Sequence, residues 1–293
     1  MRTVLLCVFV LAVWPADPDR QLTGGVRRYE LVRGDTMTAI GARFGVDPRT
    51  LARDNGLQTS AVLRPGAALI IDNRHIAPDL RTDGIVINVA QRMLFLFRDG
   101  AVVLAVPVAV GKPDWKTPLG TFTVAVKEVD PVWDVPVSIQ KEMARNGQPI
   151  LTRVLPGPAN PLGNRWLGLS AAGVGIHATN QPSSIYRFAT HGCIRVHSDD
   201  MLVLFDLVSV GTPVALTYEP VLATRSSDTV FLEVHRDPYG RIGAVDAYVE
   251  HRLREIALDA LVGTAGVRRA IAERAGRAVA IEADDVVPSA ASR

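Results

Sequence analysis

Apolar residues form one unbroken run near the amino end of the chain. The run VLLCVFVLAV covers residues 4–13 and is preceded by a basic start. A basic start followed by about 7–15 apolar residues is typical of a secretory leader, and the run is shorter than the roughly 20 residues that span a bilayer. We therefore expect residues 1–16 to be a signal peptide. An uncleaved interfacial anchor and a buried amino-terminal strand are the alternatives.

The next stretch, residues 28–72, changes from strand to helix and back within a short length. Asp35 or Thr36 can cap a first helix, and Asp47 can cap a second one, because short polar side chains accept from the free backbone N–H groups at a helix start. This pattern predicts a small α+β unit in the order strand, helix, helix, strand. Its expected strands are 29–32 and 68–71, and its expected helices begin after Thr36 and Asp47 and end near Phe44 and Asn55-Gly56.

Strand patterns become dense in residues 84–218, after a linker that we place at 72–83. Two β-rich arms flank Asp99-Gly100, and this pair is a strong hairpin signal. Many short strands with few helices indicate a mainly β domain with a curved sheet or a β-sandwich. We expect one helix at 199–207, with Ser198 as its cap and Met201, Leu202, Leu204 and Phe205 facing inward. The proline-rich loop at 132–163 is a candidate lid, since loops of that length are often functional.

The last part of the chain, residues 221–293, mixes a strand candidate with helical spacing. We expect a strand at 231–235 and helices at 246–261 and 267–274, which makes this C-terminal extension partly helical. The apolar stripe of the longer helix is interpreted as a contact with the mainly β domain. We assign the extension no function, find no constellation around His235, and expect the tail after Asp284 to be disordered.

Composition narrows the classes of partner. The chain is 48% hydrophobic and 21% charged, with a net charge of +2. Because no block of arginine or lysine stands out, nothing favours binding to nucleic acid. The histidines show no zinc spacing, so we predict no metal and no cofactor.

The two cysteines differ in their surroundings. Cys7 lies in the expected leader, so its removal would leave Cys193 as the only thiol, which cannot form a disulfide within the chain. An inert buried cysteine is the alternative to a reactive one. Cys193 follows His191 and Gly192 in ATHGCIRV, and His177 ends the strand candidate GVGIH. A thiol acts as a nucleophile when a base takes its proton or when its pKa is lowered, so these residues favour a Cys–His acyl-transfer site. Glycine beside the thiol would let the amides of Gly192 and Cys193 face a developing oxyanion.

Two segments carry motifs of known families. The first set lies in residues 28–72 and comprises Tyr29, Val32, Gly34, Asp35, Thr36, Ile40, Phe44, Asn55, Leu57, Pro65, Gly66, Leu69 and Ile71. With these residues the segment resembles a LysM module. The second set lies in residues 84–218 and comprises His177 with Thr190-His191-Gly192-Cys193-Ile194-Arg195, Gly111-Lys112, Thr117-Pro118-Leu119-Gly120-Thr121-Phe122, and Asn160-Pro161-Leu162-Gly163-Asn164-Arg165-Trp166. With these motifs the segment resembles the YkuD-type L,D-transpeptidases of Gram-negative periplasmic type.

The resemblance implies a role for each residue of the site. Cys193 would be the nucleophile and His177 the base, with His191 and Gly192 shaping the site and the oxyanion hole. Ala178 would contribute its backbone carbonyl, which orients the His177 ring. Arg195 would contact a substrate carboxylate or pair with an acid such as Asp199. We interpret Trp166 and the Thr117 motif as scaffold.

The implied reaction is peptidoglycan L,D-transpeptidation. The thiolate would attack the third residue of a stem tetrapeptide and then pass the acyl group to an amine, forming a 3–3 crosslink or anchoring an outer-membrane lipoprotein. An L,D-carboxypeptidase, another Cys–His cell-wall hydrolase and a non-catalytic LysM wall-binding protein are the alternatives. The partners would be peptidoglycan stem peptides and glycan, and the location would be the periplasm.

Overall fold

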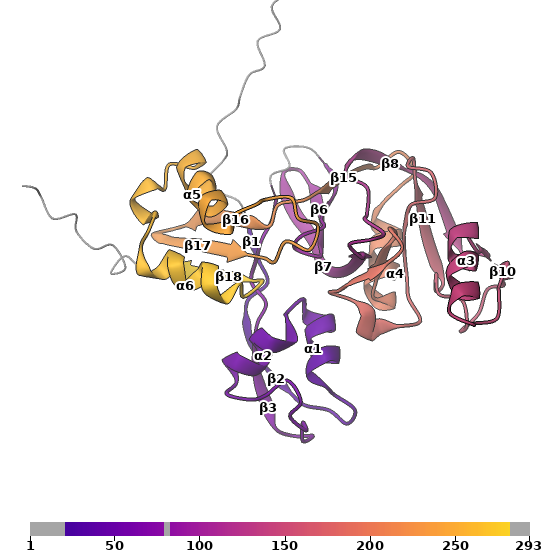
Figure 1. The fold of residues 1–293 in the computed structure, drawn as a ribbon, viewed down its shortest axis with the longest axis horizontal. Coiled ribbons are helices and arrows are strands. Elements are labelled where there is room, and N and C mark those ends of the chain that lie inside the picture. The colour runs from indigo at the N-terminus through magenta and orange to yellow at the C-terminus, as the bar shows by residue number, and fades with distance from the viewer. Residues whose placement is uncertain (1–20, 79–82, 282–293) are drawn as a thin grey trace, which may run out of the picture.

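The computed structural model describes residues 21–78 and 83–281. The expected signal peptide and the tail after Asp284 lie outside these residues. Among the helices of the described ranges, none is both long and apolar enough to cross a membrane. Figure 1 shows three units: a small α+β unit, a β-rich unit and a C-terminal unit that lies beside both.

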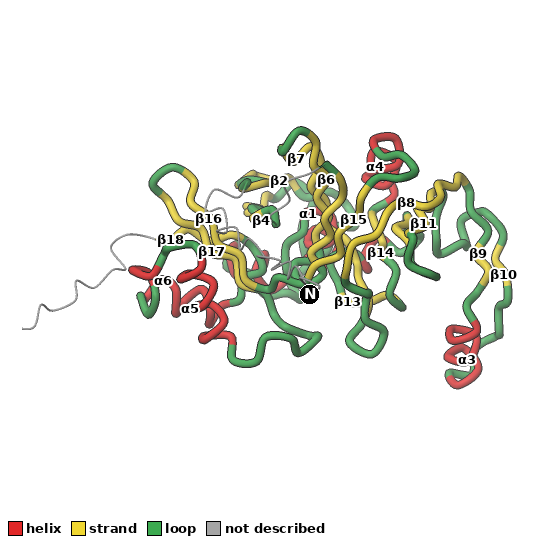
Figure 2. The backbone as a smooth tube through the Cα atoms, turned by 90° about the horizontal axis from the view of Figure 1, so that it is seen from above, coloured by secondary structure: helices red, strands yellow, loops and turns green. Residues whose placement is uncertain are grey.

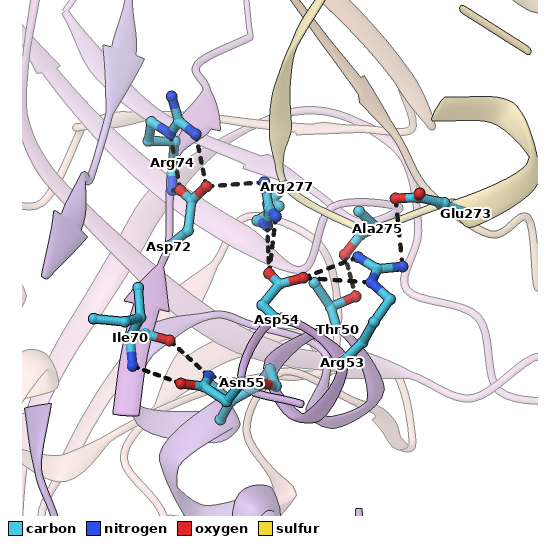
Figure 3. Close-up of polar contacts among 11 residues, drawn as sticks. Thr50, Arg53, Asp54, Asn55, Ile70, Asp72, Arg74, Glu273, Ala275 and Arg277 are labelled. Atoms are coloured by element: carbon cyan, nitrogen blue, oxygen red, sulfur yellow. Dashed lines mark hydrogen bonds and ion pairs between the residues drawn. The ribbon is translucent and has the colours of Figure 1, made fainter. Parts of the chain in front are cut away.

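The small unit has the expected order of strand, helix, helix and strand. Thr36 caps the first helix by accepting from the Ala39 N–H, and Asp47 caps the second by accepting from the Arg49 N–H. The Asn55 side chain donates to the Ile70 carbonyl and accepts from its N–H, which ties the end of the second helix to the last strand (Figure 3). The elements are β2 (Val26–Glu30), α1 (Met37–Phe44), α2 (Pro48–Asp54) and β3 (Ala68–Asp72), with β2 antiparallel to β3.

The segment after β3 is more ordered than a linker. β4 (His75–Ile76) pairs with β1 (Leu22–Thr23), and Ile76 and Ala77 are fully buried. The expected linker was therefore wrong for its first half. Ile76 packs against Leu222 and Phe231 of the C-terminal unit, a contact that no local pattern could indicate.

The β-rich unit is a nine-stranded sheet that closes on itself. The strand order is β13-β7-β14-β12-β11-β8-β15-β5-β6, and the long strand β7 also pairs with β6, which brings the two ends together. The expected mainly β fold is confirmed, and the curved sheet is a closed one. Its strands are β5 (Gly84–Asn88), β6 (Met93–Arg98), β7 (Ala101–Gly111), β8 (Gly120–Val129), β11 (Arg165–Leu169), β12 (Gly175–His177), β13 (Phe188–Thr190), β14 (Ile194–Val196) and β15 (Pro213–Thr217).

One helix, α4 (Ser198–Leu207), packs its buried Met201 and Leu204 against this sheet. Two details of the expected helix were wrong. His197, not Ser198, is the cap, since its side chain accepts from the Asp199 N–H. Leu202 faces solvent, because the buried face follows the spacing of Met201 and Leu204 and excludes the position between them.

The stretch expected as a long loop carries secondary structure. β9 (Trp133–Asp134) and β10 (Arg153–Val154) pair as an antiparallel arm, and α3 (Val137–Arg145) lies between them. Figure 2 shows this arm projecting from one end of the sheet. Buried Asn160 fixes its base by donating to the Pro131 carbonyl at 2.8 Å. A short 3-10 helix, η1 (Pro182–Ser184), follows in the β12–β13 connection.

The C-terminal unit has its own core, so the expected packing of its long helix on the β-rich unit was wrong. Val249 and Leu253 of α5 are fully buried against strands of the same unit. The helix is also shorter than expected. The elements are β16 (Val221–Ser226), β17 (Thr229–Val234), α5 (Val245–Glu255), η2 (Asp259–Leu261), α6 (Ala265–Glu273) and β18 (Ala278–Ile281).

Polar contacts join the C-terminal unit to the small α+β unit (Figure 3). The Arg277 guanidinium bridges Asp54 at 2.8 Å and Asp72 at 2.9 Å. Nearby, the buried Thr50 hydroxyl donates to the Ala275 carbonyl at 2.8 Å. These five side-chain and backbone groups connect units that are about two hundred residues apart in sequence.

A buried charged cluster joins all three units. Glu233 accepts from His75 and His235, each at 2.7 Å, and from the Gln91 amide at 2.9 Å. The other nitrogen of His75 contacts the Gly45 carbonyl at 2.8 Å. Burial opposes ionisation of Glu233, but the charge of His75 and the hydrogen bonds from both histidines outweigh it and hold the pKa of Glu233 well below its usual range. The interpretation of His235 as an isolated residue was therefore wrong.

Candidate active site

A cavity of about 840 Å³ opens beside the carboxyl ends of β12 and the start of β14. This volume lies in the range of small-molecule sites. Its walls come from the sheet on one side and from the β9-α3-β10 arm on the other. The lining includes Cys193, His177, His191 and Arg195 among the residues selected from sequence.

Strand pairing places three of these side chains on one face. β12 is parallel to β14, with Ile176 opposite Ile194 and His177 opposite Arg195. The two isoleucines are fully buried in the core. Since side chains alternate along a strand, His177 and Arg195 point to the opposite face, toward the cavity, and Cys193 just before β14 shares that side.

The His177 ring is held in one orientation. Its Nδ1 lies 2.6 Å from the Ala178 carbonyl, so Nδ1–H donates and Nε2 is left as the basic nitrogen. This is the contact that the sequence resemblance implies for Ala178. Burial and the neighbouring charge of Arg195 lower the pKa of His177 to about 4, so the imidazole is neutral at neutral pH.

Trp166 lies against the other side of His177. The two residues are paired across β11 and β12, and their rings are 5.8 Å apart. Gly175 makes room for the indole, because a Cβ there would come within 2.3 Å of it. Trp166, which we interpreted as scaffold, is half-buried and forms part of the cavity wall.

The Cys193 thiol is half-buried and in the reduced form. Burial raises the pKa of this thiol, while a hydrogen bond from the Gly175 backbone and the charge of Arg195 act in the opposite direction. The thiol and the imidazole that share this face are therefore both neutral at neutral pH. This favours proton transfer during attack over a preformed thiolate.

A tight turn carries the cysteine. Gly192 has a φ of 112°, which favours glycine. The Thr190 hydroxyl accepts from the Gly192 N–H at 3.1 Å and contacts the Cys193 carbonyl at 2.5 Å. The Thr190 side chain thus holds the Gly192 N–H within the turn, and the expected part of this amide in an oxyanion hole stays a prediction.

Thr117, from the Thr117–Phe122 motif, forms a hydrogen bond with the same turn. The buried Thr117 hydroxyl donates to the Gly192 carbonyl at 3.0 Å and accepts from the Gly111 N–H at 2.9 Å. Tyr239 of the C-terminal unit completes this arrangement: its hydroxyl accepts from the Thr117 N–H at 3.0 Å and donates to the Gly111 carbonyl at 2.8 Å. Sequence reasoning missed Tyr239, and no local signal singled it out.

His191 faces the arm instead of the thiol. Its Nε2 contacts Glu142 on α3, and its ring lies 4.8 Å from Trp115 in an edge-on arrangement. Glu142 also pairs with Lys112 at 3.0 Å. Lys112 and His191 lower the pKa of Glu142, so this carboxylate is ionised at neutral pH. Glu142 was also missed from sequence, because its partners are distant along the chain.

Arg195 forms no ion pair with Asp199 within residues 21–78 and 83–281. Its nearest side-chain partner there is the Ser184 hydroxyl at 3.4 Å, and its buried Nε has no hydrogen-bond partner. Asp199 instead lies 3.7 Å from His197. Arg195 is thus the cation of the cavity with hydrogen-bonding capacity to spare.

One group within the described ranges has metal-ligand chemistry: His75, Glu233 and His235, whose ligand atoms lie within 4.8 Å of one another. This cluster is outside the cavity. Glu233 already has hydrogen-bond partners on both oxygens, including the Ile76 N–H at 2.7 Å. Its chemistry fits a buried charge network that links the three units.

Two family models match the chain. A model described as the L,D-transpeptidase catalytic domain, YkuD, matches residues 82–216. A model described as the LysM domain matches residues 29–72. These ranges contain the cavity residues and the small α+β unit, respectively.

Curated relatives carry the same description. The probable L,D-transpeptidase ErfK/SrfK of Salmonella typhimurium is 30% identical over 249 residues, covering 81% of this chain and 79% of that protein. The probable L,D-transpeptidase YbiS of Escherichia coli is 35% identical over 177 residues, covering 58% of this chain and 56% of its own length. Among solved structures, the catalytic domain of an L,D-transpeptidase from E. faecium is 27% identical, with a TM-score of 0.38, covering 47% of this chain and 99% of that domain.

Proposed function

The chain belongs to the L,D-transpeptidase family, and on this premise we propose that it transfers peptidoglycan stem peptides through Cys193, with His177 as the base. The observation that carries the proposal is the His177 imidazole, neutral and oriented by the Ala178 carbonyl, on the same face of the sheet as the thiol. A neutral imidazole can accept a proton that a buried thiol does not release unaided.

The first half-reaction is acylation. As the Cys193 sulfur attacks the carbonyl of the third stem residue, an L-centre of diaminopimelate, the thiol proton passes to Nε2 of His177. The C–N bond to D-alanine breaks, and the proton on His177 goes to the leaving amine. A thioester on Cys193 remains.

The second half-reaction returns the thiol. An acceptor amine attacks the thioester and gives a proton to His177, and the proton then restores the Cys193 thiol. A second diaminopimelate would give a 3–3 crosslink, and a lysine of an outer-membrane lipoprotein would anchor that protein. Water in place of the amine would make the enzyme an L,D-carboxypeptidase.

Three further groups support catalysis in this proposal. The Cys193 amide holds the developing oxyanion, and release of the Gly192 N–H from Thr190 would supply a second donor. Arg195 binds a carboxylate of the substrate through its unpaired Nε, since a buried guanidinium without an acid favours an anionic partner.

The LysM module supplies the glycan contact. We propose that residues 29–72 bind the N-acetylglucosamine-containing strand of peptidoglycan, as the family resemblance implies. This substrate places the enzyme outside the cytoplasmic membrane, in agreement with the expected signal peptide, and we propose a periplasmic location.

Purified disaccharide tetrapeptide tests the reaction. With the wild-type protein we expect free D-alanine, a Cys193 acyl adduct and a 3–3 linked dimer by mass spectrometry. Cys193→Ala should abolish all three, whereas His177→Gln should slow adduct formation by roughly 10²–10⁴-fold, the usual contribution of a general base. A tripeptide product without dimer would assign the hydrolytic reaction, and unchanged products from Cys193→Ala would refute the nucleophile.

A further inference from the structure

A second cavity of about 450 Å³ lies where the three units meet. One wall comes from α1 and α2 of the LysM module. The opposite wall is the segment 185–188 that leads into β13, and the remaining side is formed by residues 235–238 and 274–276 of the C-terminal unit. None of the residues assigned to the reaction lines this cavity.

The cavity is strongly basic. Asp47 is the one acid among its lining residues within the described ranges, and its carboxylate already caps α2. Arg49, Arg187 and Arg236 are exposed. Their side chains form no hydrogen bond or ion pair with another residue in 21–78 or 83–281. The arginines that line the cavity are Arg49, Arg92, Arg187, Arg236 and Arg274.

The floor contains buried polar atoms without partners. His235 is 2% exposed, and its Nε2–H donates to Glu233. Its other ring nitrogen, Nδ1, has no hydrogen-bond partner. The buried Nε of Arg92 is also unpaired, while its guanidinium stacks 4.1 Å above the Tyr186 ring. Buried polar atoms of this kind normally have a partner.

Gly276 leaves the space for such a partner. A Cβ at this position would lie 3.6 Å from both His235 Nδ1 and the Tyr186 hydroxyl, and 3.8 Å from an Arg92 terminal nitrogen. The missing side chain thus opens a pocket edged by three polar atoms, and its φ of 70° favours glycine.

The chemistry of these atoms defines the ligand class. A neutral His235 presents an acceptor at Nδ1 and requires a donor such as an amide N–H or a hydroxyl. The arginines favour an anion, and guanidinium groups match carboxylates in a forked geometry. A peptide with a free carboxylate next to an N–H offers both, whereas a neutral glycan leaves the arginines unpaired.

We propose that this junction cavity binds a free carboxylate of a stem peptide carried by the glycan strand on the LysM module. The proposal rests on the proposed function, because it takes the LysM-bound polymer to be peptidoglycan. The peptide held here is not the one that reacts at Cys193. The cavity therefore acts as a second contact for the polymer, between the module and the catalytic sheet.

Binding of disaccharide tetrapeptide to the full-length mature protein tests this site. In a Cys193→Ala background, we expect Arg187→Gln/Arg236→Gln to raise the dissociation constant about tenfold, which corresponds to about 1.4 kcal/mol of binding free energy. The matched control Arg225→Gln/Arg241→Gln removes the same charge from exposed arginines that lie outside both the cavity lining and the LysM module. The control should bind as the parent does. A tetrapeptide with amidated carboxyl groups should bind equally to all three proteins.

Three outcomes overturn the proposal: equal affinity in the pair and the control, full affinity for the amidated peptide, or variant-sensitive binding of inorganic phosphate with none of the tetrapeptide. Turnover of free tetrapeptide by proteins that retain Cys193 separates the two proposals. An active wild type, together with unchanged tetrapeptide affinity in Arg187→Gln/Arg236→Gln, refutes the second site alone. An inactive wild type refutes the proposed function.

Discussion

The hydroxyl of Tyr239 accepts a hydrogen bond from the Thr117 backbone N–H at 3.0 Å. Tyr239 belongs to the C-terminal unit and Thr117 to the catalytic sheet, where the Thr117 side chain supports the Gly192 carbonyl next to the cysteine. The C-terminal unit, which has no assigned role, therefore reaches the turn that carries Cys193 through two residues.

Tyr239→Phe should slow acylation of Cys193 about tenfold with little change in KM. The variant leaves the Thr117 N–H and the Gly111 carbonyl buried and unpaired, which costs about 1–3 kcal/mol for each group. A stopped-flow measurement with a carbapenem, to which the family resemblance predicts acylation, gives the rate. Tyr248→Phe makes the same change at a half-buried tyrosine and should retain the wild-type rate. Wild-type acylation in Tyr239→Phe would show that the turn stands without this support.

The thiol should react as a buried neutral group in the free enzyme. Because the pKa of Cys193 is raised and that of His177 is lowered to about 4, the thiolate fraction increases only as the pH passes the raised thiol value. Alkylation by iodoacetamide should therefore keep rising above pH 9, past the ordinary cysteine pKa of about 8.5. The rate is followed by intact mass between pH 5 and 10. A plateau near pH 6 would instead indicate a thiolate–imidazolium pair.

Glu142→Gln should loosen the β9-α3-β10 arm. The substitution keeps the shape of the side chain but removes the charge that holds Lys112 and His191. We expect faster hydrogen–deuterium exchange in residues 137–145 and a KM for tetrapeptide about threefold higher, a shift of well under 1 kcal/mol. Lys141→Gln alters an exposed charge on the same helix and serves as the control. Identical exchange in both variants would mean that packing alone holds the arm.

Arg277→Ala should destabilise the protein by about 2 kcal/mol, because it removes two ion pairs from a largely buried guanidinium. Thermal unfolding measures the change. Arg254→Ala removes an exposed pair with Glu250 and should shift the midpoint far less, since surface pairs contribute about 0–1 kcal/mol. Equal shifts in the two variants would contradict a special role for the Arg277 bridge.

The sequence predicts local structure better than it predicts contacts between distant segments. Thr36 and Asp47 as caps, and the Asp99-Gly100 turn, follow from chemistry within a few residues, and each is present in the fold. The contacts of Glu142 with His191 and of Tyr239 with Thr117 join segments 49 and 122 residues apart. Such contacts depend on how the sheet closes, which no spacing along the chain encodes.

The same limit applies to the buried charges. His75, Glu233 and His235 have no common motif, and each lies in an ordinary strand pattern. They meet because β4 and β17 are brought together by packing of the C-terminal unit. In contrast, His177 and Cys193 could be selected from sequence, since their motif is compact and lies in adjacent strands.

The Arg277 bridge between Asp54 and Asp72 has a consequence for geometry. It ties α2 and β3 of the LysM module to the C-terminal unit. That unit in turn contacts the support of the Cys193 turn through Tyr239. The distance from the LysM module to the Cys193 sulfur is then fixed by contacts between folded units and not by a flexible linker. A glycan strand bound by the module would therefore meet the Cys193 sulfur at a constant distance from its binding site.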